Sequence, residues 1–293
     1  MAGKITRRQF IAGTLATGAA LLSSPIGADA GRSLKSMTDT VQLGNTGVKV
    51  SYLGLGTGTI GWNNASNQTR LGTVKFARLI RHALDQGINY FDLADTYGSH
   101  KYLRASLKGI PRENYVIETK MWFHKSRDAK AELDRFLAEL NTDYIDIMHI
   151  HCVTNPNWHN DMKSLQDVLE EAKQKKIIRT HGISIHDLQT LQQAANNPWV
   201  ENVLARINPF GEKMDGKPKD VVVALQKLHD AGKGVTGMKI LGEGAIVDKR
   251  EESLRYVLGL NCVDAIVIGF ESTDQIDEII RMGNKALRSN LRS

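Results

Sequence analysis

The stretch YIDIMHIHCVTNPNWHNDMKSLQDVLEEAKQKKIIRTHGIS (144–184) contains a complete strand–helix–strand unit. Its two ends, 144–151 and 177–184, are rich in apolar and β-branched residues, as buried strands are. Between them, 165–175 repeats apolar residues at the spacing of one helix face. Two strands joined by such a helix run parallel, so the stretch predicts an α/β fold with a parallel sheet.

The same unit recurs along the chain from residue 40. Strands are predicted at 50–56, 88–94, 115–120, 144–151, 177–184, 203–208, 235–241 and 265–269, and helices at 74–86, 99–108, 129–140, 165–175, 188–196, 221–231, 252–260 and 274–282. Eight strands, each followed by a helix with no long linker, predict a single-domain (β/α)8 TIM barrel over residues 31–293. A hairpin over 41–50, turning at Asn45–Gly47, is expected to cover the bottom of this barrel.

A GxGxxG pattern follows the first predicted strand, at Gly56, Gly58 and Gly61. In an open, doubly wound sheet this pattern leads at once into a helix that binds a dinucleotide. Here the polar segment WNNASNQTR (62–70) stands where that helix would begin, and we expect it to be a loop. The open sheet is therefore the less favoured alternative to the barrel.

The N-terminus has the features of an export signal. Arg7 and Arg8 are followed by Phe10, by a modest apolar run over 11–22, and by small residues up to Ala30. The run has the length of a signal-peptide core and is too short to span a bilayer. Because these features occur in this order, residues 1–30 resemble a cleavable twin-arginine (Tat) signal. The alternative, an Arg-Arg pair that precedes a core helix by chance, is less favoured. We therefore expect export by the Tat translocase, to the periplasm or otherwise out of the cytoplasm, with no stable membrane span.

Composition argues against two classes of protein. The net charge is +6, and part of it belongs to the predicted signal. Elsewhere both signs are mixed, without the clustered basic face that nucleic acid requires. The only two cysteines, Cys152 and Cys262, do not form a disulfide framework by number or spacing. We expect two buried free thiols, although an oxidising destination leaves a single bridge open.

Polar residues follow several predicted strands at the end where barrel active sites lie. Asp92 lies in the second strand with Tyr97 just past its end, Lys120 ends the third strand, and His151 ends the fourth. A tyrosine has a pKa of about 10, and a nearby ammonium lowers that pKa towards the range useful for proton transfer. An aspartate fixes the ammonium, and a histidine orients a carbonyl oxygen. Singly, each residue could be an ordinary core residue; jointly they predict a proton-donor site.

These motifs resemble those of the aldo-keto reductases. The resemblance rests first on FDLADTYG (91–98), the strand-end Lys120 and the IH of 150–151. It extends over nearly all of the chain from residue 40 through four further motifs: LGNTGVKVSYLGLGTG (43–58), KKIIRTHGISIHD (175–187), MKILGEG (238–244) and IGFESTDQIDEI (268–279). The resemblance implies reduction of an aldehyde or ketone to an alcohol, or the reverse, with NADP(H) or NAD(H). It implies Tyr97 as general acid/base, tuned by Lys120. Asp92 would pair with Lys120, and His151 would orient the substrate.

The resemblance also implies which residues bind the coenzyme. The nicotinamide would lie near Gly56, Thr57 and Ser184. The pyrophosphate would lie near Lys239, Leu241, Gly242 and Gly244, although the two glycines could belong to a plain tight turn. Gly269 to Ser272 precede a helix whose N-terminal amides can meet a phosphate. Gln275 and Glu278 would lie near the adenosine end.

Several of these positions depart from the family pattern. Ile185 stands where the family often has an asparagine that binds the nicotinamide carboxamide. Met238 stands where the family tends to have a tyrosine that stacks on the nicotinamide. NADP(H) is the usual coenzyme, but an uncharged Gln275 and the carboxylate of Glu271 favour NAD(H). Both coenzymes stay open.

Two rival functions are considered. His149 and His151 are two apart on one strand and share a face, an arrangement that metal-dependent barrel hydrolases use, with Asp92 as a further ligand. Against this, His124, His159 and His186 are predicted in loops, and His181 is predicted to face away from the barrel interior. A non-catalytic, nucleotide-binding barrel is the other rival, although all four catalytic positions are filled.

The substrate is not identified by the sequence. Few residues follow the last predicted helix, so we expect an open pocket and a polar or bulky substrate such as a sugar. Four aromatic residues follow strand ends, where their faces could stack on a flat substrate or could simply pack the loops: Trp62, Trp122, Phe123 and Trp158.

Overall fold

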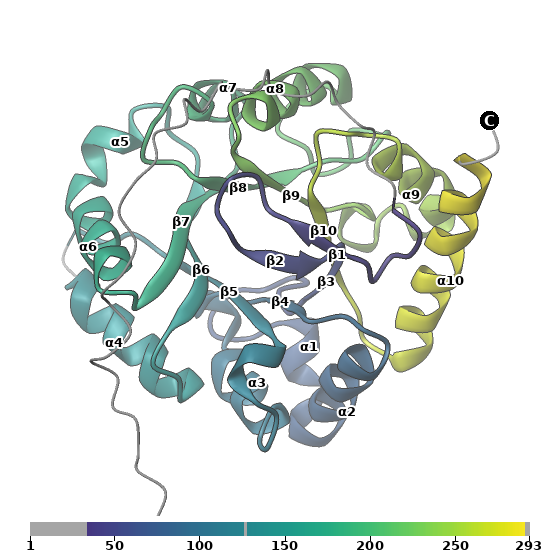
Figure 1. The fold of residues 1–293 in the computed structure, drawn as a ribbon, viewed down its shortest axis with the longest axis horizontal. Coiled ribbons are helices and arrows are strands. Elements are labelled where there is room, and N and C mark those ends of the chain that lie inside the picture. The colour runs from purple at the N-terminus through teal and green to yellow at the C-terminus, as the bar shows by residue number, and fades with distance from the viewer. Residues whose placement is uncertain (1–33, 126–127, 291–293) are drawn as a thin grey trace, which may run out of the picture. The chain divides into compact units, whose positions relative to one another are not determined.

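The computed structural model describes residues 34–125 and 128–290, so the export signal expected at residues 1–30 lies outside the described part. The described residues form a barrel of parallel strands that closes in the order β10-β3-β4-β5-β6-β7-β8-β9 (Figure 1). This confirms the predicted (β/α)8 barrel. The strands are β3 (Leu53–Gly56), β4 (Tyr90–Asp92), β5 (Val116–Met121), β6 (Ile145–Val153), β7 (Ile178–Ile185), β8 (Asn202–Arg206), β9 (Gly234–Met238) and β10 (Ala265–Gly269).

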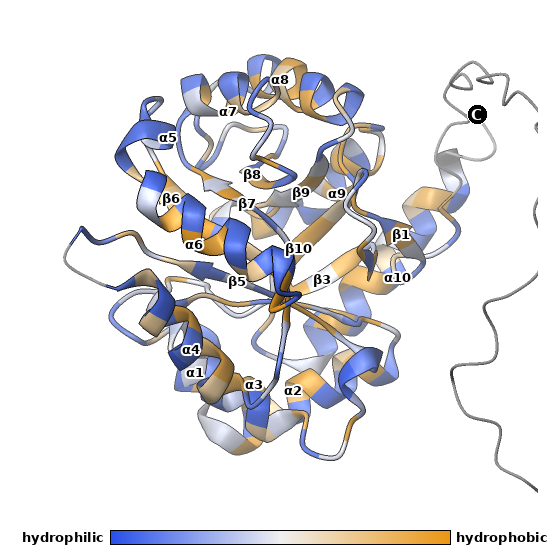
Figure 2. Ribbon diagram, turned by 60° about the vertical axis from the view of Figure 1, so that its left-hand side comes forward, coloured by the Kyte–Doolittle hydropathy of each residue, from blue (hydrophilic) through white to orange (hydrophobic). Residues whose placement is uncertain are grey.

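The helices form a ring around the strands (Figure 1). The main ones are α2 (Gly72–Asp85), α3 (His100–Ser106), α4 (Ala129–Leu140), α6 (Lys163–Gln174), α7 (Leu188–Ala194), α8 (Pro218–Asp230), α9 (Arg250–Leu258) and α10 (Thr273–Asn290). Each turns an apolar stripe inward; in α2 the buried residues are Phe76, Leu79, Ile80 and Ala83. Hydrophilic and hydrophobic residues alternate along α6 and α8 in Figure 2, as such helices require.

The predicted hairpin is also confirmed. β1 (Thr40–Gln42) pairs antiparallel with β2 (Lys49–Ser51) across the near end of the barrel in Figure 1. Its turn is tied to the chain just before β9 and β10, because Asn45 N donates to Gly232 O at 2.8 Å and Gly44 N to Asp264 Oδ2 at 3.2 Å. The hairpin therefore covers the end where the strands begin, and the opposite end is left for the site.

Three boundaries differ from the sequence prediction. The strand expected at 50–56 is two strands, because its first half pairs within the hairpin and its second half joins the barrel. The segment 62–70 is not all loop: α1 (Asn67–Arg70) begins there with a reciprocal cap between Ser66 and Thr69. The last helix continues to Asn290 rather than ending at 282, since Gly283 lies against Met37, whose Sδ would be 2.3 Å from an added Cβ.

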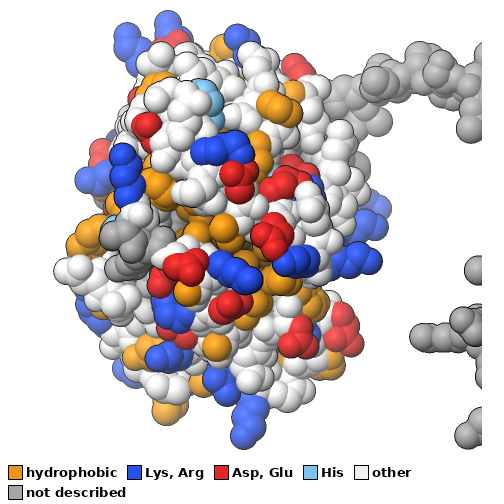
Figure 3. Space-filling view, turned by 90° about the vertical axis from the view of Figure 1, so that its left-hand side faces the viewer, with side chains coloured by type: hydrophobic (Ala, Val, Ile, Leu, Met, Phe, Trp, Pro, Cys, Tyr) orange, Lys and Arg blue, Asp and Glu red, His pale blue; other side chains and the backbone are white. Residues whose placement is uncertain are grey.

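The remaining short elements lie in the connections: η1 (Asp95–Tyr97), η2 (Arg112–Asn114), α5 (Trp158–Asp161), η3 (Gly242–Gly244) and η4 (Val247–Lys249). Among the described residues, no helix is both long and apolar enough to cross a membrane. On the face shown in Figure 3, acidic and basic side chains are interspersed. Both cysteines are free thiols, on opposite sides of the closed barrel: Cys152 lies in β6 and is only partly buried, whereas Cys262 precedes β10 and is buried as expected.

Candidate active site

The end of the barrel away from the hairpin carries a polar cluster of Asp92, Tyr97, Lys120 and His151. Asp92 ends β4 and Lys120 lies near the end of the neighbouring β5. Lys120 Nζ donates to Asp92 Oδ1 and, at 2.7 Å, to the carbonyl of Leu93. Only 1% of the Lys120 side chain is exposed, so the ammonium is held in one place beside a fixed counter-charge. The expected Asp92–Lys120 pairing is present.

Tyr97 lies in η1, directly after β4, with Lys120 Nζ 5.1 Å from its ring centroid. Glycine is required on its other side. A Cβ at Gly58 would lie 2.2 Å from Tyr97 Cε2, and one at Gly61 would lie 2.4 Å from Tyr97 Cδ1. Two glycines of the GxGxxG pattern thus make room for the tyrosine ring, and the pattern does not open a dinucleotide-binding helix.

Gly58→Ala is expected to push the Tyr97 ring away from Lys120, because the new methyl group cannot fit beside it. We expect kcat to fall about tenfold to a hundredfold, the cost of misplacing a reacting group. Steady-state kinetics measures this loss. Gly259→Ala is the matched control, since an added Cβ there meets its nearest atom at an ordinary 3.4 Å. Equal kcat values for the two variants would contradict the packing role of Gly58.

His151 completes the cluster from β6. Its ring meets Tyr97 edge-on, with centroids 5.6 Å apart and planes at 86°. His151 Nδ1 lies 3.5 Å from Asp95 Oδ1. Burial lowers the pKa of His151, even though the Asp95 carboxylate, which can accept from the ring N–H, opposes this. The imidazole is therefore neutral near pH 7 and can hydrogen-bond an uncharged carbonyl oxygen.

The pKa of Tyr97 corrects one expectation. Burial raises it to about 12, and the attraction of the Lys120 ammonium only reduces that rise. Burial also raises the pKa of Asp92 to about 6. Burial opposes the charge of Lys120, but the nearby Asp92, Tyr97 and Glu118 outweigh it and raise the pKa of the ammonium. In this state Tyr97 is a firmly protonated acid and Lys120 a permanent cation.

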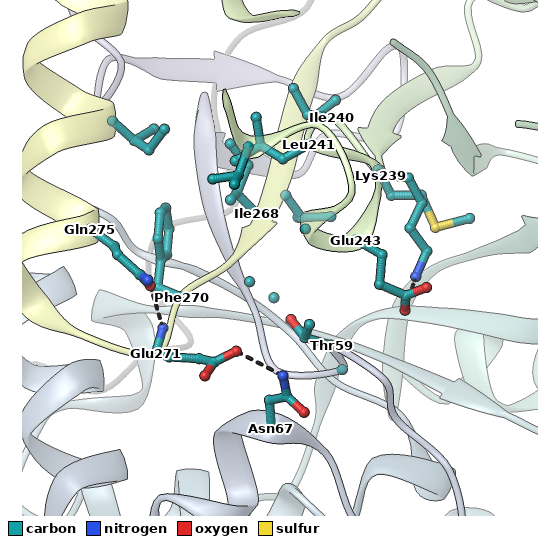
Figure 4. A pocket seen from close by; sticks show the side chains of 18 of the residues that line it. Thr59, Asn67, Lys239, Ile240, Leu241, Glu243, Ile268, Phe270, Glu271 and Gln275 are labelled. Carbon is teal, nitrogen blue, oxygen red and sulfur yellow. Dashed lines mark hydrogen bonds and ion pairs between the residues drawn. The ribbon is translucent and has the colours of Figure 1, made fainter. Parts of the chain in front are cut away.

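A groove of about 330 Å³ leads from the polar cluster to the start of α10. Asp92 and Tyr97 lie at one end, and Gln275 and Glu278 of α10 at the other. Figure 4 shows its lining: Lys239 and Glu243 approach from the segment after β9, while Thr59, Asn67 and Glu271 come from the opposite side. Seven residues predicted to lie at the coenzyme line the groove: Gly56, Lys239, Leu241, Gly244, Gly269, Gln275 and Glu278.

Polar contacts hold the walls of this groove. Glu243 accepts from Lys239 Nζ at 2.7 Å and from the backbone N of Ile60 at 3.2 Å, so it joins the segments after β9 and β3. Glu271 Oε1 accepts from Asn67 Nδ2 at 2.8 Å, and the Gln275 side chain caps the backbone N of Glu271 at 2.7 Å (Figure 4).

At the far end of the groove, Arg250 Nη2 lies 2.7 Å from Glu278 Oε1. Arg250, at the start of α9, is a cation that was not predicted at this site. Because Arg250 is already paired with Glu278, a coenzyme phosphate that binds there would have to compete with this carboxylate for the guanidinium.

The family model for the aldo/keto reductase family matches residues 52–256 of this chain. The chain belongs to the aldo/keto reductase family. Among curated relatives, an L-galactose dehydrogenase from Arabidopsis thaliana is 33% identical over 155 residues, which cover 48% of this chain and 47% of that protein. A methylglyoxal reductase from Escherichia coli O157:H7 is 27% identical over 193 residues, which cover 64% of this chain and 70% of that protein. The match thus spans about half the length of the first relative.

A solved aldo-keto reductase from Bacillus halodurans, in its holo form, has the same fold. It superposes with a TM-score of 0.68 at 20% identity, covering 86% of this chain and 95% of that one. At this identity the likeness bears on the fold alone.

Three residues predicted to bind the coenzyme do not line the groove. Thr57 is fully buried, and its Oγ1 contacts Asp92 O and Ser99 Oγ, each at 2.9 Å. Ser184 is buried, and its Oγ accepts from Cys152 N at 3.3 Å. Gly242 is buried in η3, where φ is +57°. Their roles at the coenzyme remain predictions of the family resemblance.

The residues that are present fit a dinucleotide. Gly56 lines the groove beside Asp92, and a Cβ added there would lie 3.7 Å from Asp92 Oδ2. Residues that precede α10 border the groove, so the N-terminus of an eighteen-residue helix, an end that favours phosphate, lies beside it. An extended groove that starts at a proton donor and passes a helix N-terminus has the shape and the donors that the family's coenzyme requires.

Two of the four candidate aromatic residues lie beside the polar cluster. Trp62 and Trp122 meet edge-on with centroids 5.3 Å apart, and Trp122 meets His151 at the same distance. They line a pocket of about 500 Å³ together with Asn63, Asn64, Asp95, Thr96, His124, Glu132 and Arg135. Trp158 is different: it is 2% exposed and packs on Trp199, so it is a packing residue. Phe123 is partly buried against the core.

His149 is not a metal ligand in this arrangement. Its Nε2 contacts Asn202 Oδ1, and its Nδ1 lies 3.0 Å from Glu118 Oε1. Within residues 34–125 and 128–290, no three His, Cys, Asp or Glu side chains are grouped to share a metal ion. His181 faces away from the barrel interior as predicted, because it bonds Glu170 of α6 at 3.0 Å and stacks on Trp199.

A basic group that was not predicted from the sequence lies at the barrel mouth. Arg206, at the end of β8, lies 3.0 Å from Asp215 Oδ1 and also contacts His186 Nδ1. Burial, and then the charge of Arg206, lower the pKa of His186 to about 3, so this histidine is a neutral acceptor. The signal was available: Asn202 and Arg206 are four apart on β8 and therefore share its inward face.

Proposed function

We propose that this chain is an NAD(P)H-dependent oxidoreductase that reduces the carbonyl of an aldehyde or ketone to an alcohol, or runs the reverse reaction. The observation that carries the proposal is the position of Tyr97. Its ring is enclosed by Gly58 and Gly61, contacts Lys120 and His151, and lines the end of the groove. A proton donor is thus held where a long ligand groove ends.

The side chains supply the acid chemistry. A nicotinamide coenzyme, when bound, would supply the hydride to the carbonyl carbon, or take it up in the reverse reaction. Tyr97 donates its hydroxyl proton to the carbonyl oxygen, and His151 hydrogen-bonds and orients that oxygen. Lys120 Nζ uses two of its three protons on Asp92 and Leu93 O, which leaves one for the tyrosine oxygen. The phenolate left behind therefore forms beside a fixed cation, which lowers the free-energy cost of placing its negative charge inside the barrel.

Binding and turnover test this proposal on the purified protein. NADPH and NADH are titrated separately, with fluorescence as the readout, and absorbance is then followed after a small aldehyde is added. We expect nucleotide binding and an aldehyde-dependent loss of absorbance. The nucleotide that binds with the lower dissociation constant is identified as the coenzyme. Arg250 favours NADPH, whereas the carboxylates of Glu271 and Glu278 favour NADH. A protein that binds neither nucleotide would overturn the proposal.

For the substrate class we propose a polyhydroxylated carbonyl compound such as a sugar. The support is the pocket beside His151, which combines two tryptophan faces with amide, carboxylate and guanidinium groups. Aromatic faces stack on sugar C–H surfaces, and the polar groups match hydroxyls. The relative named L-galactose dehydrogenase has a sugar in its name, which is consistent with this class.

Trp122→Ala is expected to raise KM for a sugar aldehyde about tenfold, because a stacking surface is lost. A short aliphatic aldehyde, which cannot reach Trp62 and Trp122 together, should be affected less than about threefold. Steady-state kinetics with both substrates gives the comparison. Trp158→Ala is unsuitable as a control, since Trp158 is a core residue. Trp62→Phe is the control: it keeps an aromatic face, so its KM for the sugar aldehyde should stay near the wild-type value. An equal effect on both aldehydes would exclude stacking.

We also propose that residues 1–30 direct export through the Tat translocase to the periplasm. The support is the order of Arg7, Arg8, Phe10 and the apolar run in the sequence. Cell fractionation of the full-length chain tests this. The protein should appear in the periplasm, and replacing both arginines by lysine should keep it inside. Export that is unchanged in the lysine variant would contradict a twin-arginine route.

A further inference from the structure

Below the polar cluster, the barrel interior holds a second polar pair that the proposed chemistry does not use. Glu118 of β5 is 0% exposed, and His149 of β6 is 1% exposed. Glu118 precedes Lys120 by two residues and so shares its inward face, and His149 is the strand neighbour of Lys120. A buried carboxyl and a buried imidazole thus lie directly under the catalytic lysine.

The hydrogen bonds fix where one imidazole proton lies. Asn202 Nδ2 donates to His181 O at 3.2 Å and to Thr180 Oγ1 at 2.9 Å. A carbonyl can only accept, so the amide nitrogen must face it and the amide oxygen must face His149. The same orientation follows from Thr180: its hydroxyl donates to Glu201 Oε2 at 2.8 Å, so Thr180 Oγ1 can only accept from Asn202. His149 Nε2 therefore carries a proton.

The other side of the imidazole faces a carboxyl. His149 Nδ1 lies 3.0 Å from Glu118 Oε1, and neither atom has a hydrogen bond to any other group in the described part of the chain. The second oxygen, Oε2, accepts from the hydroxyl of Tyr90. Without a proton between them, a lone pair would face a carboxylate in a dry interior, which is costly. One proton between them leaves the pair without net charge.

We propose that Glu118 and His149 share one proton and act as positioning residues that keep the Glu118 carboxylate neutralised beneath Lys120. The charge of Glu118 bears on the catalytic groups: it raises the pKa of Lys120, of Tyr97 and of Asp92. An unneutralised carboxylate there would make Tyr97 a weaker acid. The titratable groups that face the pair are Tyr90 and Asp92 from β4, Lys120 from β5, and His151 from β6.

The first experiment rests on the proposed function and uses the pH dependence of kcat/KM for aldehyde reduction. His149→Gln removes the proton-sharing partner, so Glu118 must titrate alone. We expect the pKa of Glu118 to rise, because the imidazole no longer opposes the effect of burial, and kcat/KM to fall about three- to tenfold as pH rises through this new ionisation, since Tyr97 becomes the weaker acid. Adding Glu118→Gln should remove this new limb. A His149→Gln profile like that of the wild type, or a limb that persists in the double variant, would overturn the proposal.

The second experiment needs no turnover and is therefore independent of the proposed activity. Proton NMR of the full protein, with ¹⁵N-labelled histidine, should show a strongly downfield, exchange-protected proton. The signal should vanish in Glu118→Gln, which is isosteric and can still accept from Tyr90 and donate to His149. It should remain in His181→Gln, a matched loss of a buried histidine whose partner Glu170 is 46% exposed. A wild-type spectrum without this signal, or a signal that survives Glu118→Gln, would show that no proton is shared.

Discussion

Tyr97→Phe is expected to lower kcat for aldehyde reduction by about a hundredfold to ten-thousandfold, the usual contribution of a positioned general acid. The phenyl ring still fits between Gly58 and Gly61, so only the hydroxyl is lost. Because the ring is kept and every other groove residue is unchanged, the dissociation constant of the coenzyme should move by less than about twofold. Stopped-flow turnover and fluorescence titration measure the two quantities on the same preparation.

The pH dependence gives a second check on Tyr97. Burial raises its pKa to about 12, so the acid form persists through neutral pH. The rate of carbonyl reduction should then be flat across neutral pH. Alcohol oxidation requires the phenolate and should rise about tenfold per pH unit below that pKa. If Tyr97→Phe keeps the wild-type rate, the proton must come from another group, and the assignment of Tyr97 fails.

Much of the fold could be predicted because each barrel strand is short, apolar and followed by an amphipathic helix. The departures have local causes. Tyr52 separates a hairpin strand from a barrel strand, and nothing in the alternation of 50–56 marks that division. Gly283 would normally be taken as the end of a helix, but here it makes room for Met37, a contact across most of the chain. Contacts of that kind have no signal in local periodicity.

The candidate site divides in the same way. Asp92, Lys120 and His151 could be placed because they lie at the carboxyl ends of their strands, where the active site of a barrel forms. Thr57 and Ser184 also lie at strand ends, but their hydroxyls bond to neighbouring strands, which only the register between strands decides. The sign of the Tyr97 pKa shift depends on whether burial, which raises the pKa, outweighs the attraction of the Lys120 ammonium, which lowers it. The sequence shows the lysine but not how deeply the ring is enclosed.

Lys120→Met is expected to produce the largest loss of stability among single changes at this site. It removes the partner of a carboxylate whose side chain is only 9% exposed. An uncompensated buried charge costs about 3–5 kcal/mol, and urea unfolding should show a free energy of unfolding reduced by that amount. Turnover should be lost as well. Lys163→Met is the control: its ion pair with Asp167 has side chains 66% and 62% exposed, and its loss should cost less than about 1 kcal/mol.

The pH dependence of this variant separates charge from packing. Burial raises the pKa of Asp92 to about 6 even with Lys120 present, and removing the ammonium raises the pKa further. The unfolded value is about 3.9, so the folded state binds the proton more tightly and stability falls as pH rises through the folded pKa. Lys120→Met should therefore be less destabilised near pH 5 than near pH 8. Asp92→Asn in the same chain should restore most of the stability and none of the turnover, because the buried charge is gone but Tyr97 still lacks its cation. Recovery of turnover in the double variant would mean that Lys120 serves the fold alone.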